Sequence, residues 1–302
     1  MDFFLVVICF SEYNVEKFCL EAVMLHITSS DIARLLPRRQ RDTHKGDYGK
    51  ILLLCGSRGF TGAAALAAMG ALRVGAGLVY LGVPESIYAI EAVKVTEPVV
   101  MPLPDEDGML SASAIPAIRQ LLPKMDCVLF GCGSGLGQGT EAVLKFLLES
   151  CKVPLVLDAD GITLAARHMD LLRDRVYPTI LTPHDGEFLR LRPIQADRQR
   201  ETEELAGRLG VVLLRKGHRT LISDGVWCWE NQTGNPGMAV GGSGDVLAGV
   251  ISGLLGQGLS PVDAAACGAW LHGRAGDLCA EDLGEYGMLP TDFLGYLPRL
   301  LK

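Results

Sequence analysis

The chain has no Cys-x-x-Cys pair, no apolar run long enough to cross a bilayer and no excess of positive charge. Nine cysteines occur among 302 residues, but without zinc-site spacing we expect buried thiols in a reducing cytoplasm. The net charge of −7 argues against non-specific nucleic-acid binding. Only 21% of the residues are charged and 49% are hydrophobic, which excludes disorder and predicts a large core.

The N-terminal segment of residues 3–10 is apolar but too short to span a bilayer. It also lacks the basic start of a secretory signal, because Asp2 precedes it. We expect residues 1–27 to form an extension, either a strand or a segment that the fold does not need, with Met24 as an alternative start. No internal repeat, low-complexity run or linker follows, so residues 28–302 are predicted to form one domain.

Apolar strand-length segments alternate with helix-length segments from residue 50 onward. The expected strands are 51–55, 78–81, 99–101, 127–130, 155–157, 179–181 and 211–214. The expected helices are 62–74, 86–95, 113–122, 140–150, 161–167, 185–191, 197–208, 244–256, 261–280 and 290–300. Because the strands are apolar throughout, the pattern predicts an α/β fold with a mostly parallel sheet and helices on both faces. Residues 220–222 and 226–229 are typical of a hairpin that adds a small antiparallel edge, and the polar stretch 104–111 is typical of a surface loop.

The most informative segment is residues 235–245, which end in Gly-Gly-Ser-Gly-Asp. Its glycines free the backbone to present several N–H groups to one oxyanion. The apolar run that follows predicts a helix, at whose N-terminus unpaired amides and the macrodipole favour phosphate. Asp245 then lies beside the anion, and a carboxylate there needs a metal or a transferring proton, which indicates catalysis. The structural alternative is an ordinary turn with Asp245 as a helix cap.

Two more glycine-rich turns follow predicted strands, where ligands bind in sheets of this kind. Residues 56–62 have the spacing G-x-x-G-x-x-G rather than the dinucleotide-binding G-x-G-x-x-G. This turn indicates close helix–strand packing, with ligand approach as an addition. Residues 131–137 carry four glycines, which favours a ligand close to backbone amides.

Charged residues follow three other predicted strands. His184 and Glu187 share one face of a helix start, where His184 can contact a substrate phosphate and Glu187 can hold Mg²⁺ through water. The alternative reading makes Glu187 a simple N-terminal helix charge. Lys216 beside a glycine suits a nucleotide phosphate, although an exposed turn lysine is common. Asp158 and Asp160 either bind a metal or cap a helix, and the pattern leaves both roles open.

Together these segments resemble the NAD(P)H-hydrate dehydratase family of the ribokinase-like superfamily. The matching strings lie in the family's order across residues 28–302, at 44–49, 62–79, 133–137, 182–187, 216–217 and 233–249. The resemblance implies a ribokinase-like fold and a repair lyase that acts on the S form of NADH hydrate or NADPH hydrate. It also implies that ADP or ATP phosphorylates the added hydroxyl, that Mg²⁺ neutralises the phosphates, and that phosphate elimination regenerates NAD(P)H.

The resemblance further assigns roles to single residues. Asp245 would deprotonate the substrate hydroxyl, while the amides around Gly242 and Gly244 stabilise the transferring phosphoryl group. The expected nucleotide contacts are Lys216, Gly217, His218, Arg219, Thr220, Asn235, Gly241, Gly242, Ser243 and Gly244, and the expected substrate contacts are Ala63, Gly135, His184 and Asp245. A homo-oligomer, commonly a tetramer in the family, and a functional link to a separate epimerase are also implied.

The chain departs from the family pattern at residues 158–163, where Asp-Ala-Asp-Gly-Ile-Thr replaces Asp-Ala-Asp-Ala-Leu-Asn. A polar contact from the missing asparagine is therefore in doubt. Two other functions stay open. A ribokinase-like kinase for a thiamin-precursor heterocycle would release a phosphorylated product. A nucleotide-binding sensor would not turn over, and the intact Asp245 argues against it.

Overall fold

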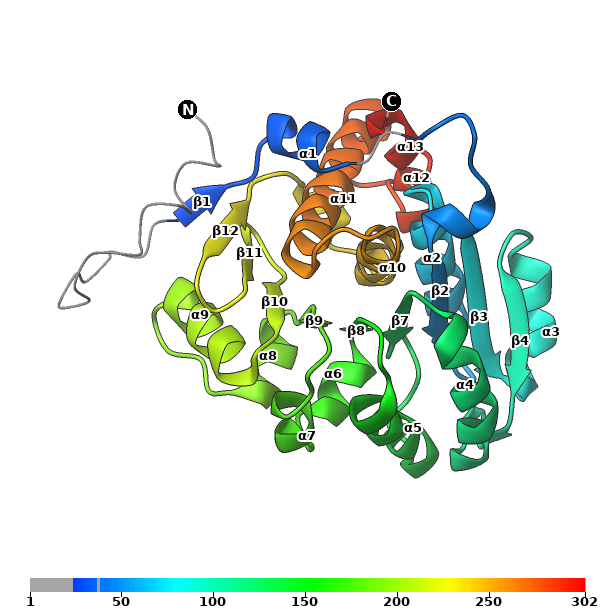
Figure 1. Ribbon diagram of the computed structural model, residues 1–302. Helices are drawn as coiled ribbons and strands as arrows, with labels where there is room; N and C mark the ends of the chain where they lie inside the picture. The colour runs from blue at the N-terminus through cyan, green and yellow to red at the C-terminus, as the bar shows by residue number, and fades with distance from the viewer. Residues whose placement is uncertain (1–23, 37–38, 302) are drawn as a thin grey trace.

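The computed structural model describes residues 24–36 and 39–301. The apolar segment 3–10, predicted to be a strand or a dispensable extension, lies outside these ranges. A single large sheet crosses the described part of the chain, and helices cover both of its faces (Figure 1). No helix in these ranges has both the length and the apolar character needed to cross a membrane.

The large sheet has ten strands in the order β1-β12-β11-β10-β9-β8-β7-β2-β3-β4. The bounds of its strands are β1 Met24–His26, β2 Lys50–Leu54, β3 Leu78–Pro84, β4 Val99–Leu103, β7 Cys127–Phe130, β8 Leu155–Leu157, β9 Thr179–Leu181, β10 Val212–Arg215, β11 Thr220–Ser223 and β12 Cys228–Asn231. Among the described strands of this large sheet, only β11 runs antiparallel to its neighbours, β10 and β12. The expected mostly parallel sheet with a small antiparallel edge is therefore confirmed.

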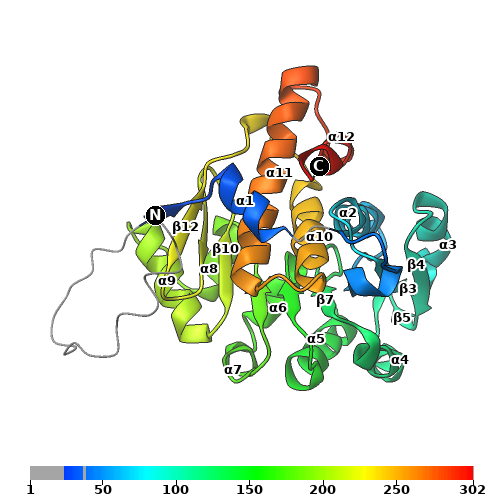
Figure 2. The same ribbon diagram turned by 45° about the horizontal axis from the view of Figure 1, so that its top comes forward.

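The helices form two layers, one on each face of the sheet (Figure 2). On one face lie α1 Ser29–Leu35, α2 Thr61–Arg73, α3 Glu85–Lys94, α10 Ser243–Gly256, α11 Pro261–Leu283, α12 Pro290–Phe293 and α13 Leu297–Leu300. On the other lie α4 Ile115–Leu121, α5 Gln138–Ser150, α6 Asp160–Ala165, α7 Met169–Arg173, α8 Asp185–Leu191 and α9 Arg198–Leu209. Each layer packs on its own apolar cluster.

Strand β2 shows why both layers are needed. Ile51 and Leu53 belong to the cluster under α2 and α10, whereas Leu52 and Leu54 belong to the cluster under α5. Successive side chains of a strand point to opposite faces, so an uninterrupted apolar strand has to be covered on both sides.

Helix α10 is positioned by small residues that it shares with α2. A Cβ on Gly249 would lie 2.0 Å from the carbonyl oxygen of Ala67, and one on Gly70 would lie 2.5 Å from that of Val246. Only glycine permits this backbone approach. The alanine-rich composition of α2 thus fixes where the first turn of α10 stands over the sheet.

The polar stretch 104–111, predicted as a loop, instead forms a ribbon of β5 Asp105–Glu106 and β6 Met109–Leu110. Leu110 is 1% exposed and joins the core under α5. The prediction was wrong here because Met109 and Leu110, which follow the Asp-Gly turn, gain burial when they pair with Asp105 and Glu106.

Smaller differences concern the ends of elements. The second hairpin strand is Cys228–Asn231 rather than 226–229, because the N–H groups of Val226 and Trp227 both donate to Oδ1 of Asp224 at 2.9 Å and extend the turn. The predicted helix 290–300 is split into α12 and α13 around Gly295. Strand β1 pairs with β12, so the sheet begins before the domain boundary expected at residue 28.

The cysteines behave as the sequence predicts. Those of the described ranges are free and buried, namely Cys55, Cys127, Cys132, Cys151, Cys228, Cys267 and Cys279. Burial raises the pKa of the Cys127 thiol and, to about 12, that of Cys267, so these side chains are protonated, apolar filling of the core.

Candidate active site

The turn before α10 and the first residues of this helix leave backbone amides open. Gly242 caps the helix with φ +100°, and no side chain caps it. The N–H of Ser243 donates to Val240 and that of Val246 to Gly242. Among the described residues, no acceptor pairs with the N–H groups of Gly244 and Asp245. Unpaired amides at the start of a long helix are an anion-binding site.

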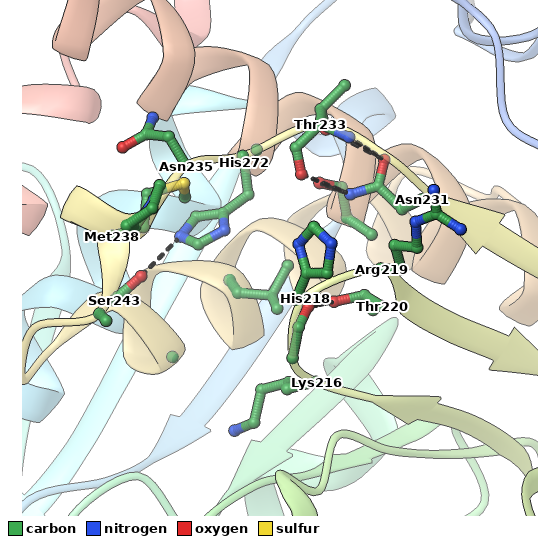
Figure 3. A pocket seen from close by; sticks show the side chains of 18 of the residues that line it. Lys216, His218, Arg219, Thr220, Asn231, Thr233, Asn235, Met238, Ser243 and His272 are labelled. Atoms are coloured by element: carbon green, nitrogen blue, oxygen red, sulfur yellow. Dashed lines mark hydrogen bonds between the residues drawn. The ribbon is translucent and has the colours of Figure 1, made fainter. Parts of the chain in front are cut away.

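A cavity of about 870 Å³ opens beside this turn. Its walls come from the loop after β10, the loop after β12, the start of α10 and the middle of α11 (Figure 3). The lining residues are His184, Lys216, Gly217, His218, Arg219, Thr220, Asn231, Gln232, Thr233, Gly234, Asn235, Pro236, Met238, Ala239, Val240, Ser243, Gly244, Leu247, Ala269, His272 and Gly273. This volume lies at the upper end of the range of small-molecule sites.

Arg198 holds the loop after β10 in place. Its guanidinium donates to the carbonyl oxygens of Arg215, Lys216, His218 and Arg219 at 3.0–3.3 Å. A Cβ on Gly217 would lie 2.7 Å from that guanidinium, so glycine is required at this position. The loop therefore presents Lys216 and its neighbours on a fixed backbone.

The loop after β12 is held from α11. Asp277 accepts the N–H of Gly234 at 3.1 and 3.2 Å and the side-chain amide of Asn235 at 3.2 Å. Asn231 donates to the carbonyl oxygens of Thr233 and Ala269. The pocket wall that carries Asn235 is thus fastened to a helix rather than left as a free loop.

His272 reaches the anion turn from α11. Its Nε2 lies 3.4 Å from Oγ of Ser243, as Figure 3 shows. Burial, with a smaller contribution from the nearby Lys216, lowers the pKa of His272 to about 4 against the opposing effect of a backbone hydrogen bond at Ser243. The imidazole is therefore neutral at pH 7 and can orient the Ser243 hydroxyl without adding charge to the site.

Lys216 and Asp158 form the charged centre of the site. The ammonium of Lys216 lies 2.7 Å from Oδ1 of Asp158 and 3.7 Å from Oε2 of Glu187. The same ammonium would lie 3.4 Å from a Cβ on Gly244, so it stands over the first turn of α10. Burial lowers the pKa of Lys216, but the attraction of Asp158 and Glu187 outweighs it and leaves the pKa raised.

Asp245 lies on the other side of Asp158. Ligand atoms of Cys132, Asp158 and Asp245 all lie within 4.8 Å of one another. Burial, followed by repulsion from Asp158, raises the pKa of Asp245 to about 7, against the opposing effects of Cys132 and Lys216. A carboxyl group with a pKa near the working pH is suited to take a proton from a bound hydroxyl.

The predicted residues are distributed unevenly around the cavity. His184, Lys216, Gly217, His218, Arg219, Thr220, Asn235, Ser243 and Gly244 line it, whereas Gly241, Gly242 and Asp245 are not among its lining residues. Asp245 lies close to Asp158, whose carboxylate pairs with the ammonium of Lys216 in the cavity wall.

The remaining predicted substrate residues gather at the ends of β2 and β7. The N–H of Gly135 donates to Asp160 at 2.8 Å, and a Cβ on Gly133 would lie 3.0 Å from Cβ of Ala63. Asp160 also contributes repulsion to the raised pKa of Asp245. Ala63 and Gly135 are therefore near the carboxylate cluster rather than in the cavity wall.

Several lining residues were not predicted from the sequence. Asn231 and Thr233 stand just before the string at 235–245 and belong to a hairpin end, a position that could have drawn attention to them. His272 and Gly273 lie inside a long apolar helix, where no local signal separates them from core residues. Only the packing of α11 beside α10 brings them to the site.

Glu187 was expected to hold Mg²⁺ through water. Its carboxylate is 5% exposed and accepts the N–H of His184 at 2.9 Å, so it also acts as a helix cap. Oxygen donors beside phosphates suit Mg²⁺, which keeps several waters and takes few protein ligands. The Glu187 carboxylate is a donor of the type that Mg²⁺ accepts and lies 3.7 Å from the Lys216 ammonium, and its role as a ligand through water stays a prediction.

A glycine pair tests how tightly the anion turn is built. Gly242→Ala places a methyl group at φ +100° and 2.5 Å from Cδ1 of Leu66, whereas Gly241→Ala meets no atom within 4 Å. We expect Gly242→Ala to lower the free energy of unfolding by about 1–3 kcal/mol and Gly241→Ala to leave it nearly unchanged. Urea denaturation of both variants measures this. Equal losses would contradict the described turn.

The raised pKa of Asp245 also predicts a pH-dependent effect on stability. The folded protein holds this proton up to pH about 7, whereas the unfolded chain releases it near pH 4. Asp245 therefore destabilises the fold fully above pH 7, and the effect fades as the pH falls through that window. We expect Asp245→Asn to stabilise the protein by on the order of 2–4 kcal/mol at pH 8 and by less at pH 5, as measured by urea denaturation. A gain independent of pH would count against this burial.

Several known proteins are similar to this chain. Residues 51–299 match the profile of the family described as NAD(P)H-hydrate dehydratase. The bifunctional NAD(P)H-hydrate repair enzyme of Moorella thermoacetica is 44% identical over 275 residues, which cover 88% of this chain and 52% of that enzyme. The chain thus spans about half the length of the curated relatives of this kind.

Two other proteins match over nearly their whole length. The ADP-dependent (S)-NAD(P)H-hydrate dehydratase of Listeria monocytogenes is 31% identical over 284 residues, covering 92% of this chain and 97% of that one. The Bacillus subtilis ADP/ATP-dependent NAD(P)H-hydrate dehydratase, co-crystallised with ATP and Mg²⁺, has a TM-score of 0.78 at 28% identity, covering 92% and 98%. These matches confirm the expected ribokinase-like fold. The chain belongs to the NAD(P)H-hydrate dehydratase family.

Proposed function

We propose that this protein is a nucleotide-dependent hydro-lyase that converts the S form of NADH hydrate or NADPH hydrate back to the reduced dinucleotide. The observation that carries the proposal is the position of Asp245, whose pKa is raised to about 7, next to two unpaired amides at the mouth of a nucleotide-sized cavity. The activity of the Listeria relative, an ADP-dependent (S)-NAD(P)H-hydrate dehydratase, supports the same substrate and an ADP requirement.

Different residues bind the phosphates and accept the proton in the proposed reaction. A nucleotide lies in the cavity with its phosphates near Lys216 and the amides of Gly244 and Asp245, which neutralise charge on the transferring phosphoryl group. Glu187 would hold Mg²⁺ through water, and the ion would supply positive charge to neutralise the other phosphate oxygens. Asp245 takes the proton from the added hydroxyl of the hydrate as the hydroxyl oxygen attacks the terminal phosphorus of the nucleotide. The nucleotide leaves one phosphate shorter.

Phosphorylation converts a poor leaving group into a good one. Hydroxide leaves the hydrated ring with difficulty, whereas phosphate departs with the electron pair of the C–O bond. Loss of a ring proton then restores the double bond of the reduced nicotinamide. Ala63, Gly135 and His184 are proposed to contact the dinucleotide during these steps, and Gly241 and Gly242 to shape the turn over which the phosphoryl group moves.

Either ADP or ATP can serve as the phosphoryl donor in this scheme, because both end in a phosphate that reaches the α10 turn. A homo-oligomer, a tetramer among the possible forms, and a functional link to a separate epimerase remain predictions. The free buried thiols of the described residues support a reducing compartment such as the cytoplasm.

The function is tested by mixing the protein with NADH hydrate, Mg²⁺ and either ADP or ATP. We expect the absorbance of reduced nicotinamide to rise with at least one of the two nucleotides and to stay flat when nucleotide is omitted. The NADPH hydrate arm ranks the two substrates. A phosphorylated product without recovered absorbance would favour the kinase function, and nucleotide binding without either product would favour the sensor.

A further inference from the structure

Asp158 is buried at the centre of the site, where neighbouring side chains donate hydrogen bonds to its carboxylate. It is 1% exposed and lies at the carboxyl end of β8. Oδ1 accepts the Thr182 hydroxyl at 2.7 Å and the Lys216 ammonium at 2.7 Å, and Oδ2 accepts the Cys132 thiol at 3.7 Å. Hydrogen bonds from these partners fix the position of the carboxylate.

The charge of Asp158 faces Asp245 at short range. Their carboxylates belong to one group with Cys132 whose ligand atoms lie within 4.8 Å of one another. Lys216 pairs with Oδ1 of Asp158 at 2.7 Å and lies close to Gly244. Two carboxylates this close do not ionise independently, because a negative charge on one opposes the ionisation of the other.

We propose that Asp158 is a positioning residue for the reaction, which acts on Asp245 through its fixed negative charge and so makes Asp245 the base. This inference deepens the proposed function and rests on it for the role of Asp245 in the reaction. The two carboxylates differ in their partners. Asp158 accepts the Thr182 hydroxyl and the Lys216 ammonium, whereas Asp245 shares with Asp158 the single proton of the Cys132 thiol.

The other charged and titratable groups around Asp245 act more weakly or in the opposite direction. Asp160, on the same loop as Asp158, also repels Asp245 but contributes least among the causes of its raised pKa. Lys216 and Cys132 lower that pKa, Cys55 contacts Cys132, and Glu187 lies 3.7 Å from Lys216. Asp158 is thus the strongest charged neighbour that favours a proton on Asp245.

The direct test follows Asp245 itself, in the whole protein without substrate or nucleotide. Carboxyl ¹³C NMR of labelled aspartate gives its titration midpoint, with Asp245→Asn assigning the resonance. We expect Asp158→Asn to lower the midpoint by about one pH unit or more, Asp158→Glu to keep it near the native value, and the matched control Asp160→Asn to lower it less. An unchanged midpoint in Asp158→Asn, or an equal shift in Asp160→Asn, would overturn the inference.

Should Asp158→Asn fail to fold because Lys216 loses its partner, the double variant Asp158→Asn/Lys216→Met removes both charges of the buried pair together and is compared with Lys216→Met. We expect the midpoint of Asp245 to be lower in the double variant than in Lys216→Met by about one pH unit or more. Equal midpoints in the two variants would overturn the inference. Because no substrate enters these titrations, their failure is separate from a failure of the NADH hydrate assay, which would overturn the proposed function.

The kinetic counterpart is a pH profile. In Asp158→Asn, we expect the acid limb of kcat/KM for the hydrate to move to lower pH by about one unit or more, even as the plateau falls. A purely structural role would lower the plateau and leave the limb where it was, and that result would contradict the inference.

Discussion

Asp245→Asn is expected to lower kcat by about 10²–10⁴-fold, the usual contribution of a positioned general base. The amide keeps the shape of the side chain but cannot take the hydroxyl proton. Because Asp245 does not line the nucleotide cavity, nucleotide affinity should change little. Single-turnover formation of NADH from NADH hydrate, alongside nucleotide binding by calorimetry, measures both parts.

The matched control is Asp170→Asn, which removes a carboxylate whose side chain is 84% exposed on the opposite layer of helices. It should behave like the native enzyme. If Asp245→Asn kept native kcat, Asp245 would not be the base, and the second carboxylate of the cluster, Asp158, would have to take that role.

Lys216→Met has the second large expected effect, a loss of about 10²–10³-fold in kcat/KM for the nucleotide, comparable to removing one preorganised donor from a charged transition state. The same change leaves Asp158 buried without its cation, so we also expect a loss of stability of about 3 kcal/mol or more. Steady-state kinetics with ADP or ATP and urea denaturation test the two parts separately.

Lys216→Met should also shift the pH profile of kcat/KM in one direction, which a loss of nucleotide binding alone does not predict. Lys216 lowers the pKa of Asp245, so its removal should move the acid limb of kcat/KM to higher pH. Lys124→Met, at an exposed lysine, serves as the control. If the variant bound nucleotide normally and kept its pH profile, the 2.7 Å contact with Asp158 would have no functional part.

Much of the sheet could be predicted because its strands are apolar on both faces. Ile51, Leu52, Leu53 and Leu54 have no polar residue among them, and such a segment is stable only between two layers of helices. The ribbon at 105–110 was missed, since its two apolar residues, Met109 and Leu110, are too few to show a strand period.

Site residues could be predicted where their role requires a residue type or spacing that is visible in the local sequence. Gly242 is needed for its positive φ and Lys216 stands beside Gly217 at a strand end, so both attract attention in the sequence alone. The local sequence around His272, Asp277 and Arg198 has no such motif. They act through contacts between distant segments, Ser243 with α11 and residues 215–219 with α9, which only the folded chain reveals.

The role of Asp158 lies between these cases. Its position after an apolar strand indicated a site, but a metal ligand and a helix cap were equally consistent with the sequence. The Lys216 ammonium at 2.7 Å and the Thr182 hydroxyl at 2.7 Å show how the buried charge is balanced, which neither alternative included.

The coupling of phosphoryl transfer to dehydration is tested most directly by counting products. With NADH hydrate, Mg²⁺ and the active nucleotide, inorganic phosphate, the shortened nucleotide and NADH should appear in equal amounts, and all three should be lost together in Asp245→Asn. NADH formed without nucleotide consumption would contradict transfer of a phosphoryl group over the α10 turn to an oxygen deprotonated by Asp245.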